Sequence, residues 1–125
     1  MAVDKKKTEL KKYYCFMEDI IDLLKRMDLF QDEIISRPSS IKEDLKNIIR
    51  IRSCLIDNYD EYDISEKSEE IYGFLLRKGY LIEDLENAQI KLGPTYFKEL
   101  QDKKIKKSLI ANLLLGFGLG FFLNT

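Results

Sequence analysis

The charged side chains of this chain end abruptly at Lys107. All 21 basic and 22 acidic residues lie within residues 1–107, whereas residues 108–125 carry no charge. A helix that is apolar on every side must be buried, either in protein or in lipid. The boundary therefore divides the chain into a charged helical domain, residues 1–107, and an apolar C-terminal segment, residues 108–125.

The first half of the charged domain has the pattern of amphipathic helices. Lys, Glu, Ile and Leu dominate and only two prolines occur, which favours helix. An apolar stripe with steps of three and four predicts a first helix over about residues 8–36: Leu10, Tyr13, Met17, Ile20, Leu24 and Met27, with Ile34 continuing the series. Pro38 is expected to end this helix, and Ser40 with Glu43 forms a capping box that starts a second one.

A third helical region is expected to begin near Asp63 or Ser65, because either side chain can cap a helix. Apolar residues at helical spacing continue on both sides of Gly79: Ile71, Leu75, Ile82, Leu85 and Leu92. This pattern favours one helix that is broken or kinked at Gly79, a stop at Gly93, and a last helix from about Thr95. The expected fold is all-α, an antiparallel bundle of three to four amphipathic helices with a hydrophobic C-terminal helix.

The apolar segment has nearly the length of a membrane span. A helix over residues 108–123 would be about 24 Å long at ~1.5 Å per residue, slightly short of a ~30 Å bilayer core. The residues expected in lipid are Leu109, Ile110, Leu113, Leu114, Leu115, Phe117, Leu119, Phe121, Phe122 and Leu123. Three glycines among them can let a second helix approach closely, and two of them have G-x-x-x-G spacing: Gly116, Gly118 and Gly120.

Positive charge lies directly before the apolar segment, at Lys103, Lys104, Lys106 and Lys107. Basic residues beside an apolar span mark its cytoplasmic side. We therefore expect a membrane-associated protein whose main domain faces the cytoplasm, with lipid as the partner of the C-terminal segment. The charged opening residues do not resemble a secretory signal, so secretion is not expected. The alternative is that the apolar segment is a core helix of the bundle or an oligomerisation segment.

Histidine is absent from the chain. This absence excludes imidazole bases, Ser-His and Cys-His nucleophilic sites and His-ligated zinc. Cys15 and Cys54 lack CxxC spacing and are expected to be free thiols in a reducing compartment. The net charge of −1 gives no support for a nucleic-acid partner. We expect no enzymatic activity, no cofactor, no metal and no small-molecule substrate.

Carboxylates leave one catalytic alternative open. Glu83 and Glu86 would lie one turn apart on a helix, and three further glutamates are near in sequence: Glu66, Glu69 and Glu70. Magnesium prefers such oxygen ligands, as in all-helical nucleotide pyrophosphohydrolases. Acidic pairs at this spacing are common on charged helices, so a solvated face is the preferred interpretation. The acidic run over residues 57–63 does not fit a calcium loop, because Tyr62 occupies the position that needs glycine.

These patterns together predict a non-enzymatic, membrane-tethered helical module that binds a protein partner or associates with itself. One alternative is a soluble helical inhibitor or immunity-type protein, whose apolar segment is buried in its own core or in a partner's groove. Another is a protein that perturbs or permeabilises membranes through the C-terminal segment.

Overall fold

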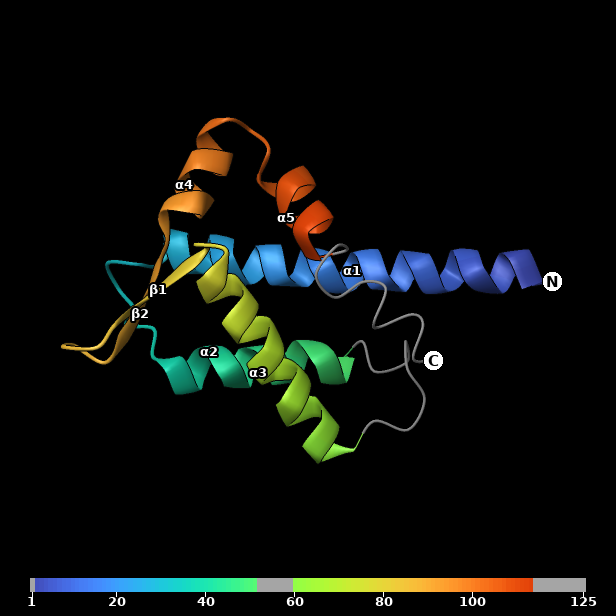
Figure 1. The fold of residues 1–125 in the computed structure, drawn as a ribbon, viewed down its shortest axis with the longest axis horizontal. Helices are drawn as coiled ribbons and strands as arrows, with labels where there is room; N and C mark the ends of the chain where they lie inside the picture. Colours follow the sequence, from blue (N-terminus) through green and yellow to red (C-terminus); the bar gives the residue numbers. More distant parts are fainter. Residues whose placement is uncertain (1, 52–59, 114–125) are drawn as a thin grey trace.

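The structure is a computed structural model that describes residues 2–51 and 60–113, with residues 2–13 and 113 described by their backbone alone. It confirms a mostly helical fold. The elements in chain order are α1 Ala2–Leu29, α2 Pro38–Ile51, α3 Glu61–Arg77, β1 Leu81–Asp84, β2 Gln89–Leu92, α4 Pro94–Gln101 and α5 Ile105–Leu113. In Figure 1, the long α1 runs through the middle of the molecule. In this view α2 lies on one side of it and α4 and α5 on the other, the end of α3 reaches it, and the hairpin lies near its C-terminal end.

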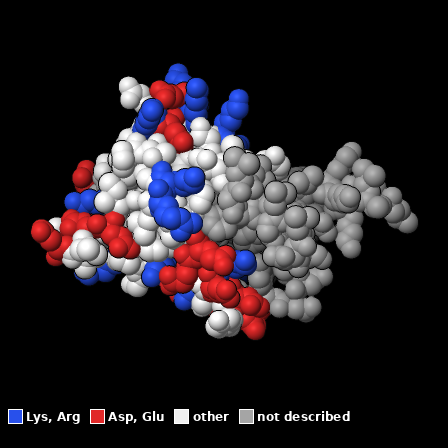
Figure 2. All heavy atoms as spheres, in the orientation of Figure 1, with Lys and Arg blue, Asp and Glu red and all other residues white. Residues whose placement is uncertain are grey.

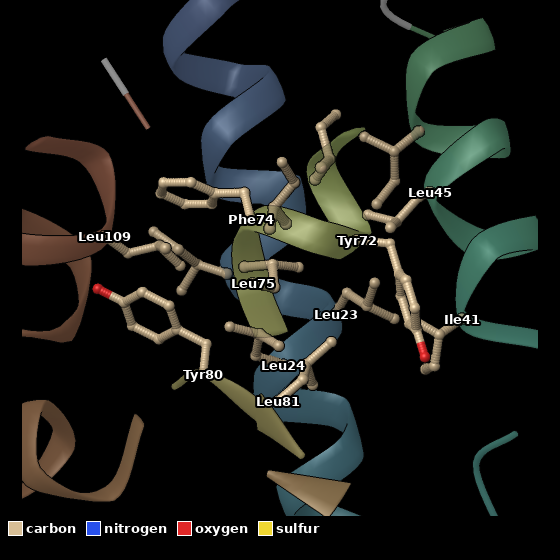
Figure 3. Close-up of a cluster of buried hydrophobic side chains, with 14 of the residues drawn as sticks. Leu23, Leu24, Ile41, Leu45, Tyr72, Phe74, Leu75, Tyr80, Leu81 and Leu109 are labelled. Atoms are coloured by element: carbon tan, nitrogen blue, oxygen red, sulfur yellow. The ribbon is translucent and has the colours of Figure 1, made fainter. Parts of the chain in front are cut away.

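One core joins all seven elements. Met17, Ile20 and Leu24 of the predicted stripe on α1 are fully buried, which confirms that part of the first helix. The other large residues that are almost completely buried come from every remaining element or its edge: Ile41, Leu45, Ile71, Leu75, Tyr80, Leu81, Ile90, Tyr96 and Leu109. Figure 3 shows side chains from α1, α2, α3, the hairpin and α5 converging on this cluster. Burial of a large apolar side chain stabilises the fold by about 1.5–3 kcal/mol, so this cluster fixes how the helices are arranged.

The prediction of one helix across Gly79 is wrong. Residues 81–92 form an antiparallel hairpin in which Leu81 pairs with Leu92 and Asp84 with Gln89. Gly79 has φ +81°, a left-handed conformation that glycine adopts without strain and that ends α3. Leu81 at the start of β1 is buried, whereas the next two residues, Ile82 and Glu83, are exposed. Ile82 and Leu85, assigned from sequence to the apolar helix face, are 46% and 84% exposed.

Gly93 brings α4 close to the end of α3. A Cβ atom at Gly93 would collide with the carbonyl group of Gly79. The Gly93 N–H donates to the Tyr80 carbonyl at 2.8 Å, and the Thr95 N–H donates to the Gly79 carbonyl at 3.1 Å. The absence of a side chain at Gly93 therefore allows backbone hydrogen bonds that fix the start of α4.

Two predicted helix boundaries differ from those observed. The first helix ends at Leu29 rather than near residue 36, and Ser36 instead lies beside β2, where its carbonyl accepts the Ile90 N–H at 2.8 Å. Pro38 does not end a helix but occupies the first position of α2, where its missing N–H costs nothing. The Ser40 hydroxyl accepts the Arg37 N–H, so Ser40 lies inside the first turn rather than at its cap.

The third and last helices also differ from their predicted limits. The third helix begins at Glu61, because the Asp60 carboxylate caps it by accepting the Asp63 N–H at 2.8 Å. The last helix is divided into α4 and α5, and Lys103 between them has φ +58°. The break prevents a continuous helix from Thr95 into the apolar segment.

Candidate functional site

The segment between α1 and α2 exposes large apolar side chains. Phe30, Ile34 and Ile35 are 38%, 59% and 60% exposed, and we refer to these three residues as the connection surface. Clustered exposed apolar residues mark interaction sites more often than single ones do. Sequence reasoning placed Ile34 on a helical stripe and missed this surface. The sequence feature that could have indicated this surface is the pair of apolar residues Ile34 and Ile35 shortly before Pro38.

Two hollows flank the connection surface. The first has a volume of about 340 Å³, an apolar lining that includes Leu23 and Ile41, and the polar side chains of Arg26 and Asp44. The second, about 300 Å³, lies on the other side, where β2 and Phe97 of α4 complete its wall. Ile34 and Ile35 line both hollows. The two hollows can therefore accept apolar side chains of another molecule on either side of the connection surface.

The first hollow contains a pair of opposite charges. Desolvation raises the pKa of the Asp44 carboxyl, and the positive charge of Arg26 opposes this shift. The two groups therefore give the hollow a polar margin beside its apolar lining. Polar margins around apolar centres are typical of protein interfaces.

The four lysines predicted to lie next to a membrane are all exposed: Lys103, Lys104, Lys106 and Lys107. Lys106 forms an ion pair with Glu18 of α1, with 3.0 Å between Nζ and Oε1. In Figure 2, Lys and Arg side chains project from the edge of the molecule where Figure 1 places α4 and α5. Within the described residues, no salt bridge joins Glu99 to Lys103 or Asp102 to Lys106, because the helix breaks between α4 and α5.

The start of the predicted membrane segment belongs to the protein core. Leu109 is completely buried, Ile110 packs against the core cluster, and Ile105 just before the charge boundary is 6% exposed. Figure 3 shows the Leu109 side chain directed from α5 toward the cluster that contains Leu75. The other predicted lipid-facing residues beyond Leu113, and the three glycines, lie outside the described residues: Leu114, Leu115, Phe117, Leu119, Phe121, Phe122, Leu123, Gly116, Gly118 and Gly120.

A buried polar network holds α5 in this position. The Tyr80 hydroxyl donates to Oε1 of Glu99 at 3.0 Å, and the Asn112 amide donates to the Tyr80 oxygen at 2.9 Å. Burial raises the pKa of Glu99, and its second carboxyl oxygen is buried without a partner among the described residues. The network connects the start of the hairpin to α4 and α5. Sequence reasoning missed it, because the three residues come from separate segments.

The glutamates of the catalytic alternative do not converge. Glu83 accepts the Tyr72 hydroxyl at 2.6 Å, Glu69 pairs with Lys42 at 3.2 Å, and Glu70 pairs with Lys67. Glu86 follows β1 in the hairpin turn, so it is not one helical turn from Glu83. Across residues 2–51 and 60–113, no three His, Cys, Asp or Glu side chains are grouped to hold a metal ion.

Two further observations bear on the predicted sites. None of the helices in the described ranges is long and apolar enough to cross a bilayer. Cys15 is a half-buried free thiol, and Cys54 lies outside the described residues.

Comparison with protein-family models, with curated proteins and with solved structures found no match to this chain.

Proposed function

We propose that this protein is a non-enzymatic helical interaction module that is tethered to a membrane through its apolar C-terminal segment. The observation that carries the interaction role is the connection surface, because Phe30, Ile34 and Ile35 are exposed together between two hollows. The partner we propose there is a protein segment with an apolar face. Transfer of these side chains out of water would supply the main favourable free energy of binding.

The charge boundary supports the membrane tether. Exposed lysines at 103–107 stand next to an uncharged stretch that begins at Ser108. Lysines in this position can pair with anionic lipid headgroups while the apolar residues enter the acyl region. The docking of Leu109 restricts the tether, because a side chain in the protein core is not available to lipid. We therefore assign the proposed lipid contact to the part of the segment after α5.

Membrane fractionation of the full chain with a high-salt wash, which removes proteins held by charge alone, tests the tether. We expect the wild-type chain in the washed membranes and the variant Phe117→Asp/Phe121→Asp in the supernatant, because charges in lipid are strongly unfavourable. Tyr62→Asp is the matched control, since Tyr62 is an aromatic residue of α3 that is 73% exposed and lines neither hollow beside the connection surface. Recovery of the wild-type chain in the supernatant would exclude the tether. Truncation at Lys107 is unsuitable, because it also removes Leu109 and Asn112 from the folded domain.

Site-specific photocrosslinking tests the connection surface. A crosslinker at Ile34 is expected to capture one defined partner, and Ile35→Asp in the same chain is expected to abolish that adduct. Leu85 provides the control position, because it is 84% exposed but lies on the hairpin. The same adducts from both positions would mean that the connection surface is not a specific binding site.

The burial of Leu109 favours a second candidate function, a soluble helical inhibitor or immunity-type protein with the apolar segment in its own core. In that case the partner would bind the connection surface as before, and no lipid would be needed. The fractionation experiment distinguishes the two candidates, because only the tethered module remains in washed membranes.

A further inference from the structure

The face shared by α1 and α2 differs from the connection surface in its charge pattern. Four residues of α1 lie along it at steps of three and four: Asp19, Asp22, Arg26 and Leu29. Residues at these steps share one side of a helix. The acidic pair precedes the basic residues Lys25 and Arg26, so the face is negative toward one end of α1 and positive toward the other.

Apolar side chains are exposed on the same face. A shallow hollow of about 610 Å³ lies between α1 and α2, and Ile48 and Ile51 of α2 complete its lining. Leu29 at the end of α1 is 75% exposed, and Ile51 at the end of α2 is 68% exposed. The two helices run in opposite directions in Figure 1, so these exposed residues lie toward opposite ends of the face.

The charges at the centre of the face are available for intermolecular contact. Asp22, Lys25 and Arg26 are all exposed. Within the part of the chain that the structure describes, neither Asp22 nor Lys25 takes part in a salt bridge. Arg26 acts electrostatically on Asp44, which lies on the side of the first hollow.

We infer that two copies of this chain associate through this face, with their α1 helices antiparallel. A two-fold axis between Asp22 and Arg26 places Asp22 of each copy opposite Arg26 of the other. The step from Arg26 to Leu29 equals the step from Asp22 to Asp19, so Leu29 of each copy then faces Asp19 of the other. There it lies beside Ile48 and Ile51, which line the same hollow.

This arrangement is self-complementary in charge, and it brings the exposed Leu29 of each copy next to the apolar Ile48 and Ile51 of the other. Two-fold symmetry uses every contact twice, as in the isologous interfaces of most homodimers. The ion pairs determine the antiparallel register, and transfer of Leu29 and Ile51 out of water favours association. The inference goes beyond the proposed function, because it names a second copy as the occupant of the α1–α2 face, which shares Arg26 with the first hollow but none of the three residues of the connection surface.

Charge reversal in the full chain tests the inference. Sedimentation equilibrium in density-matched detergent measures the dimer dissociation constant of the wild type, of Asp22→Arg and of Arg26→Asp. Each reversal replaces two attractive contacts with two repulsive ones, so we expect each variant alone to dimerise at least about tenfold more weakly. Glu66→Arg is the control, because Glu66 is exposed on α3 and should leave the constant unchanged.

Mixing the two variants makes the test specific. The variant Asp22→Arg has arginine at positions 22 and 26, and the variant Arg26→Asp has aspartate at both. The two variants should therefore attract each other, and an equimolar mixture should recover wild-type affinity as a heterodimer. The double variant Asp22→Arg/Arg26→Asp should recover it as a homodimer. A monomeric wild type, a mixture no tighter than its components, or dimerisation unaffected by either reversal would each overturn the inference. Because the readout is mass in solution, it is independent of the membrane fractionation.

Discussion

The substitution Leu109→Ala tests whether α5 is part of the folded domain. Leu109 is completely buried and lies in the cluster that contains Leu75 and Tyr80, whereas its sequence position places it in an uncharged stretch suited to lipid. The two locations exclude each other for a single side chain. A measurement of the free energy of unfolding therefore reports where Leu109 is in the native state.

The expected cost follows from the burial of Leu109. Truncation of a fully buried leucine to alanine loses the transfer free energy of three carbon atoms and leaves a cavity, which together cost about 3 kcal/mol. For a chain of 125 residues, the entropy of unfolding converts this loss to a decrease of about 10 °C in Tm. Leu85→Ala is the matched control, because Leu85 is 84% exposed and its truncation should cost less than about 0.5 kcal/mol.

Urea unfolding of the full chain, followed by far-ultraviolet circular dichroism, measures both values from the midpoint and the m-value. We expect the midpoint of Leu109→Ala to fall well below that of Leu85→Ala, with unchanged m-values. Equal midpoints for the two variants would refute the reasoning, because they would show that α5 contributes no packing energy. In that case Leu109 would be free to enter a membrane.

Three further predictions concern the network, a close backbone contact and a helix cap. Burial raises the pKa of Glu99, so the stability contributed by the protonated Glu99 carboxyl is complete below the ordinary pKa of glutamate and is lost as the pH rises through the raised pKa. The variant Glu99→Gln does not titrate but keeps an acceptor for the Tyr80 hydroxyl. It should therefore reduce the difference in urea midpoint between pH 4 and pH 7. Gly93→Ala should destabilise the protein by about 3 kcal/mol, because the new Cβ atom would collide with the backbone carbonyl group of Gly79. Gly73→Ala should instead stabilise it by about 0.5–1 kcal/mol, because the new Cβ atom would meet only the flexible end of the Arg77 side chain. The urea midpoints of the two variants should therefore move in opposite directions. Asp60→Ala should cost about 1 kcal/mol, measured as a thermal shift, and no shift would mean that the cap contributes nothing.

The sequence predicts the helical class and much of the core, because both depend on local periodicity. Met17, Ile20 and Leu24 recur at helical spacing, and all three are buried. The start of α2 was predicted within three residues, since Ser40 acts locally on the first turn. Such features need no knowledge of which segments meet in space.

The hairpin could not be predicted from the same signals. Residues 81–84 and 89–92 are too short for an alternating pattern to be distinguished from a helical one, and Ile82 and Leu85 happen to match helical spacing. The turn contains neither glycine nor proline, and Ala88 adopts φ +52° instead. Its stabilisation by Asn87, which donates to the Asp84 carboxylate, becomes visible only in the structure.

The candidate surfaces depend on these tertiary details. Ile34 has the spacing of a core residue if the first helix continues, and it becomes exposed only because α1 ends at Leu29. The pairing of Tyr80 with Glu99 similarly requires the hairpin to direct the chain back onto α4. Periodicity alone therefore identifies candidate core positions, but the helix ends decide which of them remain exposed.

The polar contact of α5 distinguishes two ways to build the proposed tether. Leu109 would lose little by moving from the protein core to lipid, since both are apolar, but Asn112 would lose its hydrogen bond to Tyr80. The buried Tyr80 hydroxyl would keep Glu99 as its only described partner. A span that starts at Ser108 must break these contacts, because residues 108–112 cannot pack on α1 and contact lipid at once. A tether that begins after α5 keeps them and leaves the exposed lysines beside the membrane surface. Preservation of the network therefore favours the second arrangement.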